Sequence, residues 1–563
     1  MSRTALKVTV CLALLGQALS DTQPRAVAAE KTDFLRELQT EAISKGKSPL
    51  AHWGPSGSIY AEWSTHSNRL IPVYTFGTKN SGAGIDLTSY QGANSPYRTA
   101  DALQKIYMRM PSNSVNPNAE YIDQTNIFDL QQAALKAGKK NIILVVFDGM
   151  DWQTTRAAAL YNLKKIGYTA GRGTGTHFQT YDAGGTSQYG FMVTSPHNEG
   201  TDVDVNAQTV KNPGGKMFGG YNVELGGPNP WTPGSDVQYL ISKSKNPAGQ
   251  HAYTDSSSSA SSMTAGIKTY NNAVNVDFQG QQVRTIAHIA QAAGYSVGAI
   301  TSVPISHATP AASYAHNVER DDYQDLTRDL LGLKSVSHPN QPLLGLDLLM
   351  GTGWGAEVQD VKSGKKKQGD NFVAGNLYLA ADDLKQIRAE NGGKYIVAQR
   401  TAGVTGADGI QRGVAEALQL KKRFLGFYGV AATGHLPFAT ADGKFNPTIG
   451  KGKEKGKEVY TEADLIENPT LADMTEGALK YLSAQPTKGF WLMVEAGDVD
   501  WANHDNNIDN SIGAVNSGDR AVKTVTDWVE KHSNWQETVV IVTADHGHYL
   551  FLDQPELLFP PTK

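Results

Sequence analysis

The chain has 563 residues, of which 40% are hydrophobic and 19% charged, and this composition is typical of a folded globular protein rather than a disordered or fibrous one. Its formal net charge of -4 gives no general attraction for nucleic acid or anionic lipid, which argues against polyanion binding as the main function. The length fits one large domain with insertions, or two domains.

The first residues have the layout of a secretory signal peptide. Arg3 and Lys7 precede an apolar run from Val8 to Leu19, and small residues suited to cleavage follow. The run is too short to cross a bilayer as a helix, and no later apolar run reaches about 18 residues. We therefore predict a signal peptide over 1–28, no transmembrane segment, and export to the periplasm or the extracellular space. Cys11 is the only cysteine, so the mature chain would contain no disulfide.

From residue 141 onward, short apolar runs alternate with helical patterns. N-I-I-L-V-V-F at 141–147 is typical of a strand buried on both faces, and a helical pattern follows over 153–163. Further strands are predicted at 296–301, 423–428, 489–494 and 538–543, with helices at 282–293 and 519–532 and another opened by Asn468-Pro469. This alternation predicts an α/β fold, a three-layer sandwich around a mainly parallel central sheet.

The domain organisation is predicted from the same pattern. Residues 29–140 are expected to form an N-terminal extension that packs on the core, and 141–563 a catalytic domain with loop insertions. The insertions are expected near 171–249, rich in Gly, Asn, Thr and Pro, and near 431–466, which contains the Lys/Glu run at 450–458. The first insertion is long enough to form a lid over a site, or to be a plain surface insertion.

Carboxylates and histidines follow several of the predicted strands. In a parallel sheet the ligand lies beyond the carboxyl ends of the strands, and the side chains that fall there are Asp148, His307, Thr309, Glu495, Asp500, His504, Asp545 and His546. A single histidine is more often a core or surface residue, but this joint arrangement favours a metal site. Mixed carboxylate and imidazole ligands suit Zn²⁺, whereas the oxygen donors of Asp148, Thr309 and Glu495 suit Mg²⁺.

The segment Y-T-D-S-S-S-S-A-S-S at 253–262 contains a candidate nucleophile, Ser256. A serine hydroxyl is a poor nucleophile at neutral pH unless a base or a metal draws off its proton. Serine-rich runs are often flexible linkers. This one continues into Met263, Ile267 and Tyr270, which favours a packed segment.

Five segments together resemble the alkaline phosphatase family of metal-dependent phosphomonoesterases, which is built on an α/β sandwich, and they occur in the family's order. They are N-I-I-L-V-V-F-D-G-M at 141–150, T-D-S-S-S-S-A-S-S-M-T-A-G-I-K-T-Y-N-N-A at 254–273, H-A-T-P-A-A-S-Y-A-H-N-V-E-R at 307–320, E-A-G-D-V-D-W-A-N-H at 495–504 and V-T-A-D-H-G-H at 542–548.

The resemblance implies the chemistry of the site. Ser256 would attack the phosphorus of small phosphate monoesters and form a phosphoserine intermediate, while Arg320 would clamp the phosphate oxygens and Asp255 would orient Arg320 or a metal-bound water. Two zinc ions and one magnesium ion are expected. The implied ligands are Asp500 and His504 for the first zinc, Asp148, Asp545 and His546 for the second, and Asp148, Thr309 and Glu495 for magnesium. Many relatives are homodimers, so a homodimer is one expectation.

The chain departs from the family pattern at three places. His307 stands where some bacterial members carry aspartate, and Trp501 stands where they carry lysine. The family takes a third ligand for its first zinc from a histidine well beyond the D-H-x-H segment, yet no histidine follows His548 here. The alternatives are His435, which we favour, His548, and an open position filled by water.

Other functions remain as alternatives at this point. A phosphodiesterase of the same superfamily would favour bis-esters, and a non-catalytic phosphate-binding relative would keep the fold without the activity. A sulfatase would require a C/S-x-P-x-R pattern, which is absent around Ser256.

Overall fold

A computed structural model describes residues 33–358, 360, 367–431, 433–446 and 459–559. The predicted signal peptide and the Lys/Glu run at 450–458 lie outside these residues. Within the described part, no helix is both long and apolar enough to cross a membrane.

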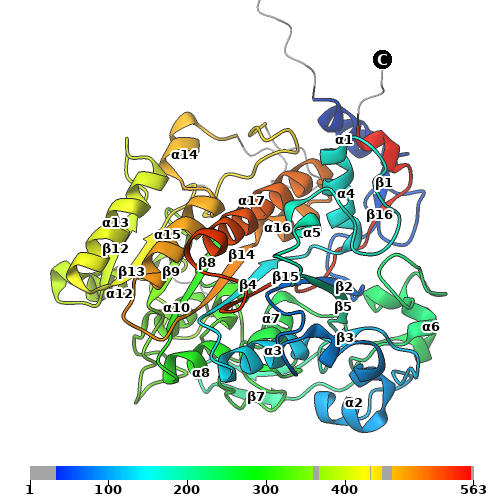
Figure 1. The fold of residues 1–563 in the computed structure, drawn as a ribbon, viewed down its shortest axis with the longest axis horizontal. Coiled ribbons are helices and arrows are strands. Elements are labelled where there is room, and N and C mark those ends of the chain that lie inside the picture. The colour runs from blue at the N-terminus through cyan, green and yellow to red at the C-terminus, as the bar shows by residue number, and fades with distance from the viewer. Residues whose placement is uncertain (1–32, 359, 361–366, 432, 447–458, 560–563) are drawn as a thin grey trace, which may run out of the picture.

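The centre of the molecule is a ten-stranded sheet in the order β12-β13-β9-β8-β14-β4-β15-β2-β5-β3 (Figure 1). The seven strands from β12 to β15 in this order are parallel to one another, whereas β2 runs antiparallel to both β15 and β5. The prediction of a mainly parallel sheet is therefore confirmed. The strands are β2 (Ile71–Phe76), β3 (Ile122–Asp123), β4 (Asn141–Phe147), β5 (Gln188–Val193), β8 (Ser296–Pro304), β9 (Leu348–Thr352), β12 (Tyr395–Gln399), β13 (Arg423–Phe427), β14 (Phe490–Ala496) and β15 (Thr538–Thr543).

Helices cover both faces of the sheet, which confirms the three-layer sandwich (Figure 1). One layer consists of α3 (Thr125–Lys136), α7 (Ser256–Ala265), α8 (Ile286–Ala292) and α9 (Ala308–Ala312), with α10 (Tyr323–Leu331) packed on α9. The other layer consists of α4 (Trp152–Leu163), α5 (His177–Thr180), α13 (Gly406–Leu420), α15 (Leu471–Ser483), α16 (Asp498–His504) and α17 (Ile508–His532), with α1 (Phe34–Lys45) packed on α17.

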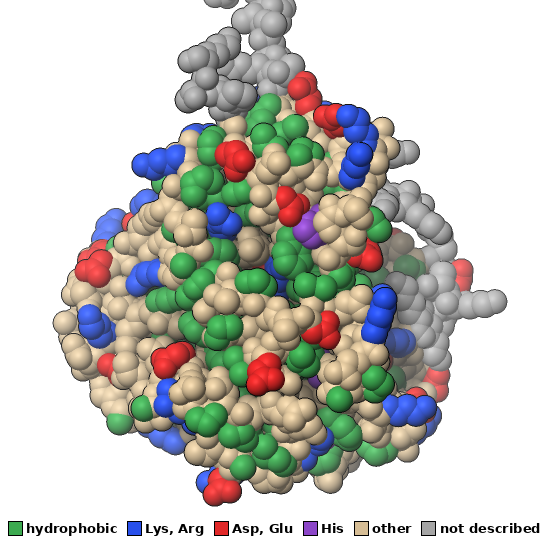
Figure 2. Space-filling model, turned by 90° about the vertical axis from the view of Figure 1, so that its right-hand side faces the viewer, with side chains coloured by type: hydrophobic (Ala, Val, Ile, Leu, Met, Phe, Trp, Pro, Cys, Tyr) green, Lys and Arg blue, Asp and Glu red, His purple; other side chains and the backbone are tan. Residues whose placement is uncertain are grey.

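Most buried apolar residues form one large cluster between the sheet and its two helix layers, and two smaller clusters lie apart from it. Every residue of β4, β14 and β15 is buried, because a central parallel strand has a helix layer on each side. That is why these strands are continuous apolar runs in the sequence rather than alternating ones. On the face shown in Figure 2, acidic and basic side chains are interspersed with apolar ones and form no large patch of one sign.

Two predicted helices have different first residues in the structure. The helix predicted from 282 begins at Ile286, because Thr285 caps it and forms a capping box with His288. The helix predicted from 519 begins already at Ile508, where the Asn507 side chain accepts a hydrogen bond from the Asn510 amide. Local capping, rather than apolar periodicity, sets both boundaries.

The segment before residue 141 is woven into the sheet. β2 and β3 are members of the central sheet, and β1 (Ala51–Trp53) pairs antiparallel with β16 (Leu550–Leu552) near the other end of the chain. The segment 171–249 likewise contributes β5 to the sheet, and it also carries the antiparallel pair β6 (Asp202–Asp204) and β7 (Thr209–Asn212). Segments expected to decorate the core thus extend its sheet on the β15 side.

Candidate active site and metal centre

The predicted site residues meet at one edge of the sheet. Asp148 follows β4, Glu495 lies near the end of β14, and Asp545 and His546 follow β15. These three strands are parallel neighbours in register, with Glu495 opposite Val146 and Thr543 also opposite Val146, so their carboxyl ends coincide. The antiparallel strand β2 begins at this same edge, since Val73 pairs with Thr543.

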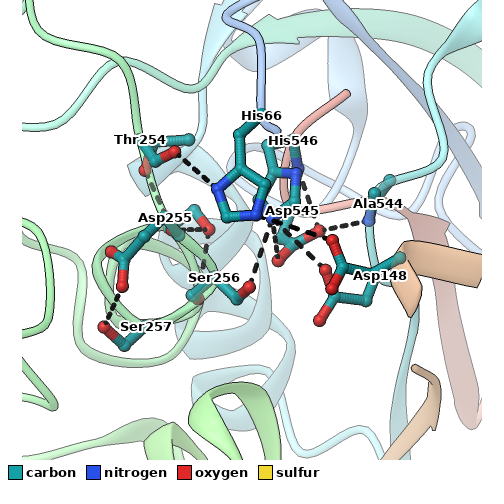
Figure 3. A network of polar contacts seen from close by, with 12 residues as sticks. His66, Asp148, Thr254, Asp255, Ser256, Ser257, Ala544, Asp545 and His546 are labelled. Carbon is teal, nitrogen blue, oxygen red and sulfur yellow. Dashed lines mark hydrogen bonds and ion pairs between the residues drawn. The ribbon is translucent and has the colours of Figure 1, made fainter. Parts of the chain in front are cut away.

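Ser256 is the first residue of helix α7. Asp255 caps this helix, and its carboxylate accepts a hydrogen bond from the Ser258 amide at 3.0 Å. The hydroxyl of Ser256 lies 3.2 Å from Nε2 of His546 (Figure 3). The small side chains of the helix allow it to be buried along its whole length, and its amide end favours a bound anion.

Arg320 is held beside this helix by Asp255. Its NH1 donates to the Asp255 carboxylate at 3.0 Å, and its NH2 lies 3.4 Å from Nε2 of His307. Although burial raises the pKa of Asp255, the nearby Arg320 charge and the Ser258 hydrogen bonds lower it below its usual value, so Asp255 is charged. Asp255 therefore fixes one side of the guanidinium, as the orienting role requires.

His546 is the centre of a group of oxygen atoms. Its Nε2 lies 3.3 Å from an oxygen of Asp148 and 3.3 Å from Oδ2 of Asp545, in addition to the Ser256 hydroxyl (Figure 3). Asp148, Asp500 and His546 each offer a ligand atom within 4.8 Å of the other two. Neither carboxylate oxygen of the buried Asp148 has a hydrogen-bond partner among the described residues. A buried carboxyl group with two unused oxygens is a suitable ligand for a metal ion.

A second group contains a residue that the sequence did not single out, His66. His66, Asp500, His504 and His548 each offer a ligand atom within 4.8 Å of the others. Nδ1 of His66 faces the Thr254 carbonyl at 3.1 Å, and Nδ1 of His504 faces the Ser64 carbonyl at 2.6 Å. A carbonyl only accepts, so both Nδ1 atoms carry the proton in the neutral rings. The Nε2 atoms of His66 and His504 are then both lone-pair nitrogens.

These two lone pairs face each other. The Nε2 atoms of His66 and His504 are 3.2 Å apart, and they lie 3.6 Å and 3.5 Å from Oδ1 of Asp500. Burial lowers the pKa of His504 to about 3, so this ring is neutral at neutral pH. Three acceptors converge here, and each imidazole is oriented by a backbone carbonyl, so this group could hold a divalent metal ion such as zinc.

The other two candidates for the third zinc ligand have different surroundings. Nε2 of His548 lies 2.6 Å from Oδ1 of Asp500, as expected of a donor that orients this carboxylate. His435 is buried, with Nδ1 2.5 Å from the Leu436 carbonyl and its ring stacked on Phe438 at 3.9 Å. His435 therefore does not belong to the group around Asp500, contrary to the preference drawn from the sequence.

The carboxylates of the site repel one another. Burial and the charges of Asp500, Asp545 and Glu495 raise the pKa of Asp148 well above its usual range. Burial also raises the pKa of Glu495 to about 8 and that of Asp545 to about 7. The Thr301 hydroxyl donates to Glu495, and both this hydroxyl and that of Thr309 partly offset the rise in the pKa of Glu495. Bound cations would remove the repulsion, so the residues present fit a polymetal centre.

A cluster of aromatic rings lies beside Arg320. The ring of Trp501 lies edge-on to His307, with centroids 5.7 Å apart, and also edge-on to His435 at 5.2 Å. No sequence pattern predicted this cluster, although two of the three departures from the family pattern, His307 and Trp501, are part of it.

Comparison with known proteins finds similarity to alkaline phosphatases. A family model described as alkaline phosphatase matches residues 228–556. The alkaline phosphatase of Escherichia coli is 30% identical over 331 residues, which cover 58% of this chain and 64% of that protein. Alkaline phosphatase 3 of Bacillus subtilis is 28% identical over 299 residues, covering 52% of this chain and 49% of that protein. The solved alkaline phosphatase of the Antarctic bacterium TAB5 aligns with 73% of this chain and 80% of that one, at 20% identity and a TM-score of 0.41.

The fold is an α/β sandwich, and the carboxyl-end edge of its sheet carries groups of carboxylates and histidines that could hold metal ions. Since the family model covers more than half of the chain, the chain belongs to the alkaline phosphatase family. It spans between about half and two thirds of the length of these two curated relatives. His66 and Asp148 lie before the matched range, so their place in the site comes from the structure.

Proposed function

We propose that the protein hydrolyses phosphate monoesters to an alcohol and inorganic phosphate through a phosphoserine intermediate on Ser256. The observation that carries this proposal is the convergence of the Ser256 hydroxyl, the N-terminus of α7 and the Arg320 guanidinium on the edge of the metal-ligand groups. Family membership supports phosphomonoester chemistry in general.

The chain's own residues bind and orient the phosphate. Arg320 presents the guanidinium nitrogens not held by Asp255 to two phosphate oxygens, and the first amides of α7 face the same anion. Asp255 keeps the guanidinium from rotating, because Asp255 is itself held by the Asn272 amide at 3.1 Å and the Ser257 hydroxyl at 2.8 Å. Ser256 lies at the start of the helix, where its oxygen faces the centre of the site.

The residues divide into three ligand sets. We assign His66, Asp500 and His504 to a first zinc, with His548 orienting Asp500, and we assign Asp148, Asp545 and His546 to a second zinc. Asp148, Thr309 and Glu495 form the set for magnesium. When bound, the ions would lower the pKa of the Ser256 hydroxyl and neutralise charge on the entering and leaving oxygens.

The test is hydrolysis of p-nitrophenyl phosphate by the mature protein, before and after chelation and re-addition of zinc and magnesium. Activity should disappear on chelation and return with the metals, and acid quenching should trap one phosphoryl group on the peptide that contains Ser256. A matched control is Ser259→Ala, because Ser259 lies on the same helix and its hydroxyl donates only to backbone carbonyls.

Ser256→Ala should lose both the trapped phosphate and turnover, whereas Ser259→Ala should keep both. Full turnover by Ser256→Ala would refute the nucleophile. Faster hydrolysis of the bis-ester than of the mono-ester would instead favour a phosphodiesterase.

We also propose that the protein is exported, from the signal-peptide layout of residues 1–28. N-terminal sequencing of the protein recovered outside the cytoplasm should begin after a small residue near positions 20 or 28. A mature protein that retains Met1 would contradict this.

A further inference from the structure

A third group of metal-ligand residues lies outside the candidate active site. His316, Asp329 and His338 each offer a ligand atom within 4.8 Å of the other two. His316 follows α9, Asp329 belongs to α10, and His338 lies in the loop that leads from α10 to β9. All three are largely withdrawn from solvent, since Asp329 is fully buried, His316 is 5% exposed and the side chain of His338 is 12% exposed.

The tautomer of His316 is set by its surroundings. Its Nε2 lies 2.9 Å from the Val283 carbonyl, which only accepts, so Nε2 carries the proton of the neutral ring. Nδ1 is then a lone-pair nitrogen, and it is buried with no hydrogen-bond partner among the described residues. The ring of His288 stacks on His316, with centroids 5.1 Å apart, and limits its rotation. A fixed, buried and unused imidazole lone pair is the donor that a divalent metal takes.

Asp329 supplies the charge of this group. Its carboxylate accepts from the Ser335 hydroxyl at 2.6 Å and from the His316 amide at 3.0 Å, so both oxygens are fixed in position. Nδ1 of His338 lies 2.9 Å and 3.1 Å from the two oxygens. Among the described residues, no lysine or arginine forms an ion pair with Asp329. The negative charge therefore has only imidazoles as neighbours able to balance it.

We propose that His316, Asp329 and His338 bind a divalent metal ion of the borderline class, Zn²⁺ or Co²⁺, at a site separate from the catalytic centre. Two imidazoles and one carboxylate are a common zinc donor set, and a water can take the fourth position on the side where His338 is exposed. Mg²⁺ and Ca²⁺ prefer all-oxygen sites and are not expected here.

The position of the site gives the metal a structural role. It would tie the loop after α10 to α10 and to the segment 313–320, which ends in Arg320. Disulfides stabilise many exported proteins, but this chain has a single cysteine, Cys11, and cannot form one internally. A metal cross-link would take that stabilising role here.

The experiment compares metal content and cobalt spectra of the full mature chain with those of His338→Asn. The matched control is His52→Asn, because His52 also pairs with an aspartate, Asp553, at 2.8 Å but has no third ligand among the described residues. After equilibration with Zn²⁺ and gel filtration, His338→Asn should hold one equivalent less per chain than either the parent or His52→Asn. With Co²⁺, the parent-minus-variant spectrum should show the absorption of one tetrahedral ion.

Equal metal content in the parent and His338→Asn would overturn the proposal. If circular dichroism shows that His338→Asn is not folded, Asp329→Asn provides the second variant. Asp329→Asn keeps the shape of the side chain and removes its charge. A Zn²⁺-dependent rise in melting temperature that is equally large in the parent and in a folded variant would also overturn it. None of these measurements depends on phosphatase activity.

Discussion

Replacement of His66 by alanine should weaken binding of the first zinc and leave the second in place. His66 is 8% exposed, and its Nε2 faces His504 at 3.2 Å and Asp500 at 3.6 Å. Loss of a residue that merely orients a metal ligand typically lowers metal affinity by about 10- to 100-fold. Removing one of three protein ligands should cost at least about 100-fold, or about 2.8 kcal/mol.

The assay is competition between the protein and a chelator of known zinc affinity, followed by metal analysis of the protein. The parent should release its two active-site zinc ions in separate steps or in one tight step. His66→Ala should release one of them at a chelator concentration at least about 100-fold lower. Circular dichroism and the melting temperature would establish that the variant is folded, since His66 also stacks on His546 with centroids 3.7 Å apart.

His435→Ala is the matched comparison. Like His66, His435 is a buried histidine, but it packs against Trp501 and lies outside the ligand group. It should retain both active-site zinc ions at the parent's affinity. The assignment of His66 would be refuted if His66→Ala kept the parent's affinity. Loss of a zinc ion from His435→Ala would count against it as well.

Three further outcomes follow from the site. Arg320→Lys should lower kcat/KM by about 10- to 100-fold, because lysine lacks the fork that contacts both Asp255 and the phosphate; an unchanged value would remove Arg320 from phosphate binding. Trp501→Lys should tighten inhibition by inorganic phosphate about tenfold and slow product release, by adding a charge-assisted hydrogen bond; unchanged inhibition and turnover would defeat this. The metal-free protein should lose stability as the pH rises from about 5 to 9, because Glu495 and Asp545, with pKa values of about 8 and 7, bind more protons in the folded than in the unfolded state. The melting temperature, measured across this pH range with and without metals, tests this prediction. An equally steep fall of the melting temperature with pH in the presence of metals would contradict it.

The central sheet could be predicted because its strands are buried on both faces. Short, continuous apolar runs such as 141–147 and 538–543, set between helical patterns, are typical of strands inside a parallel sheet. The rule that ligands lie beyond the carboxyl ends of such strands brought Asp148, Glu495 and Asp545 together correctly. Helix boundaries were less accurate, because side-chain caps such as Thr285 and Asn507 decide them.

His66 and β5 could not be predicted, because their places depend on which strands become neighbours. β5 lies in a glycine-rich segment and is only partly buried, so its sequence lacks a clear strand pattern. His66 is a single histidine shortly before the apolar run Ile71–Phe76, and that position was the one available signal. It reaches Asp500 only because β2 pairs antiparallel with β15. His435 was favoured for its place after β13, but β9 and β8 separate β13 from β14.

The place of β2 between β5 and β15 has a consequence for biosynthesis. During vectorial synthesis β5 emerges soon after β2, whereas β15 is among the last elements to emerge. For most of that time one side of β2 is an unpaired strand edge, which is a hazard for aggregation. The ligand group of His66, Asp500 and His504 cannot assemble in that period either. If zinc binds this group as proposed, it would be acquired only after the segments around His66 and Asp500 have come together.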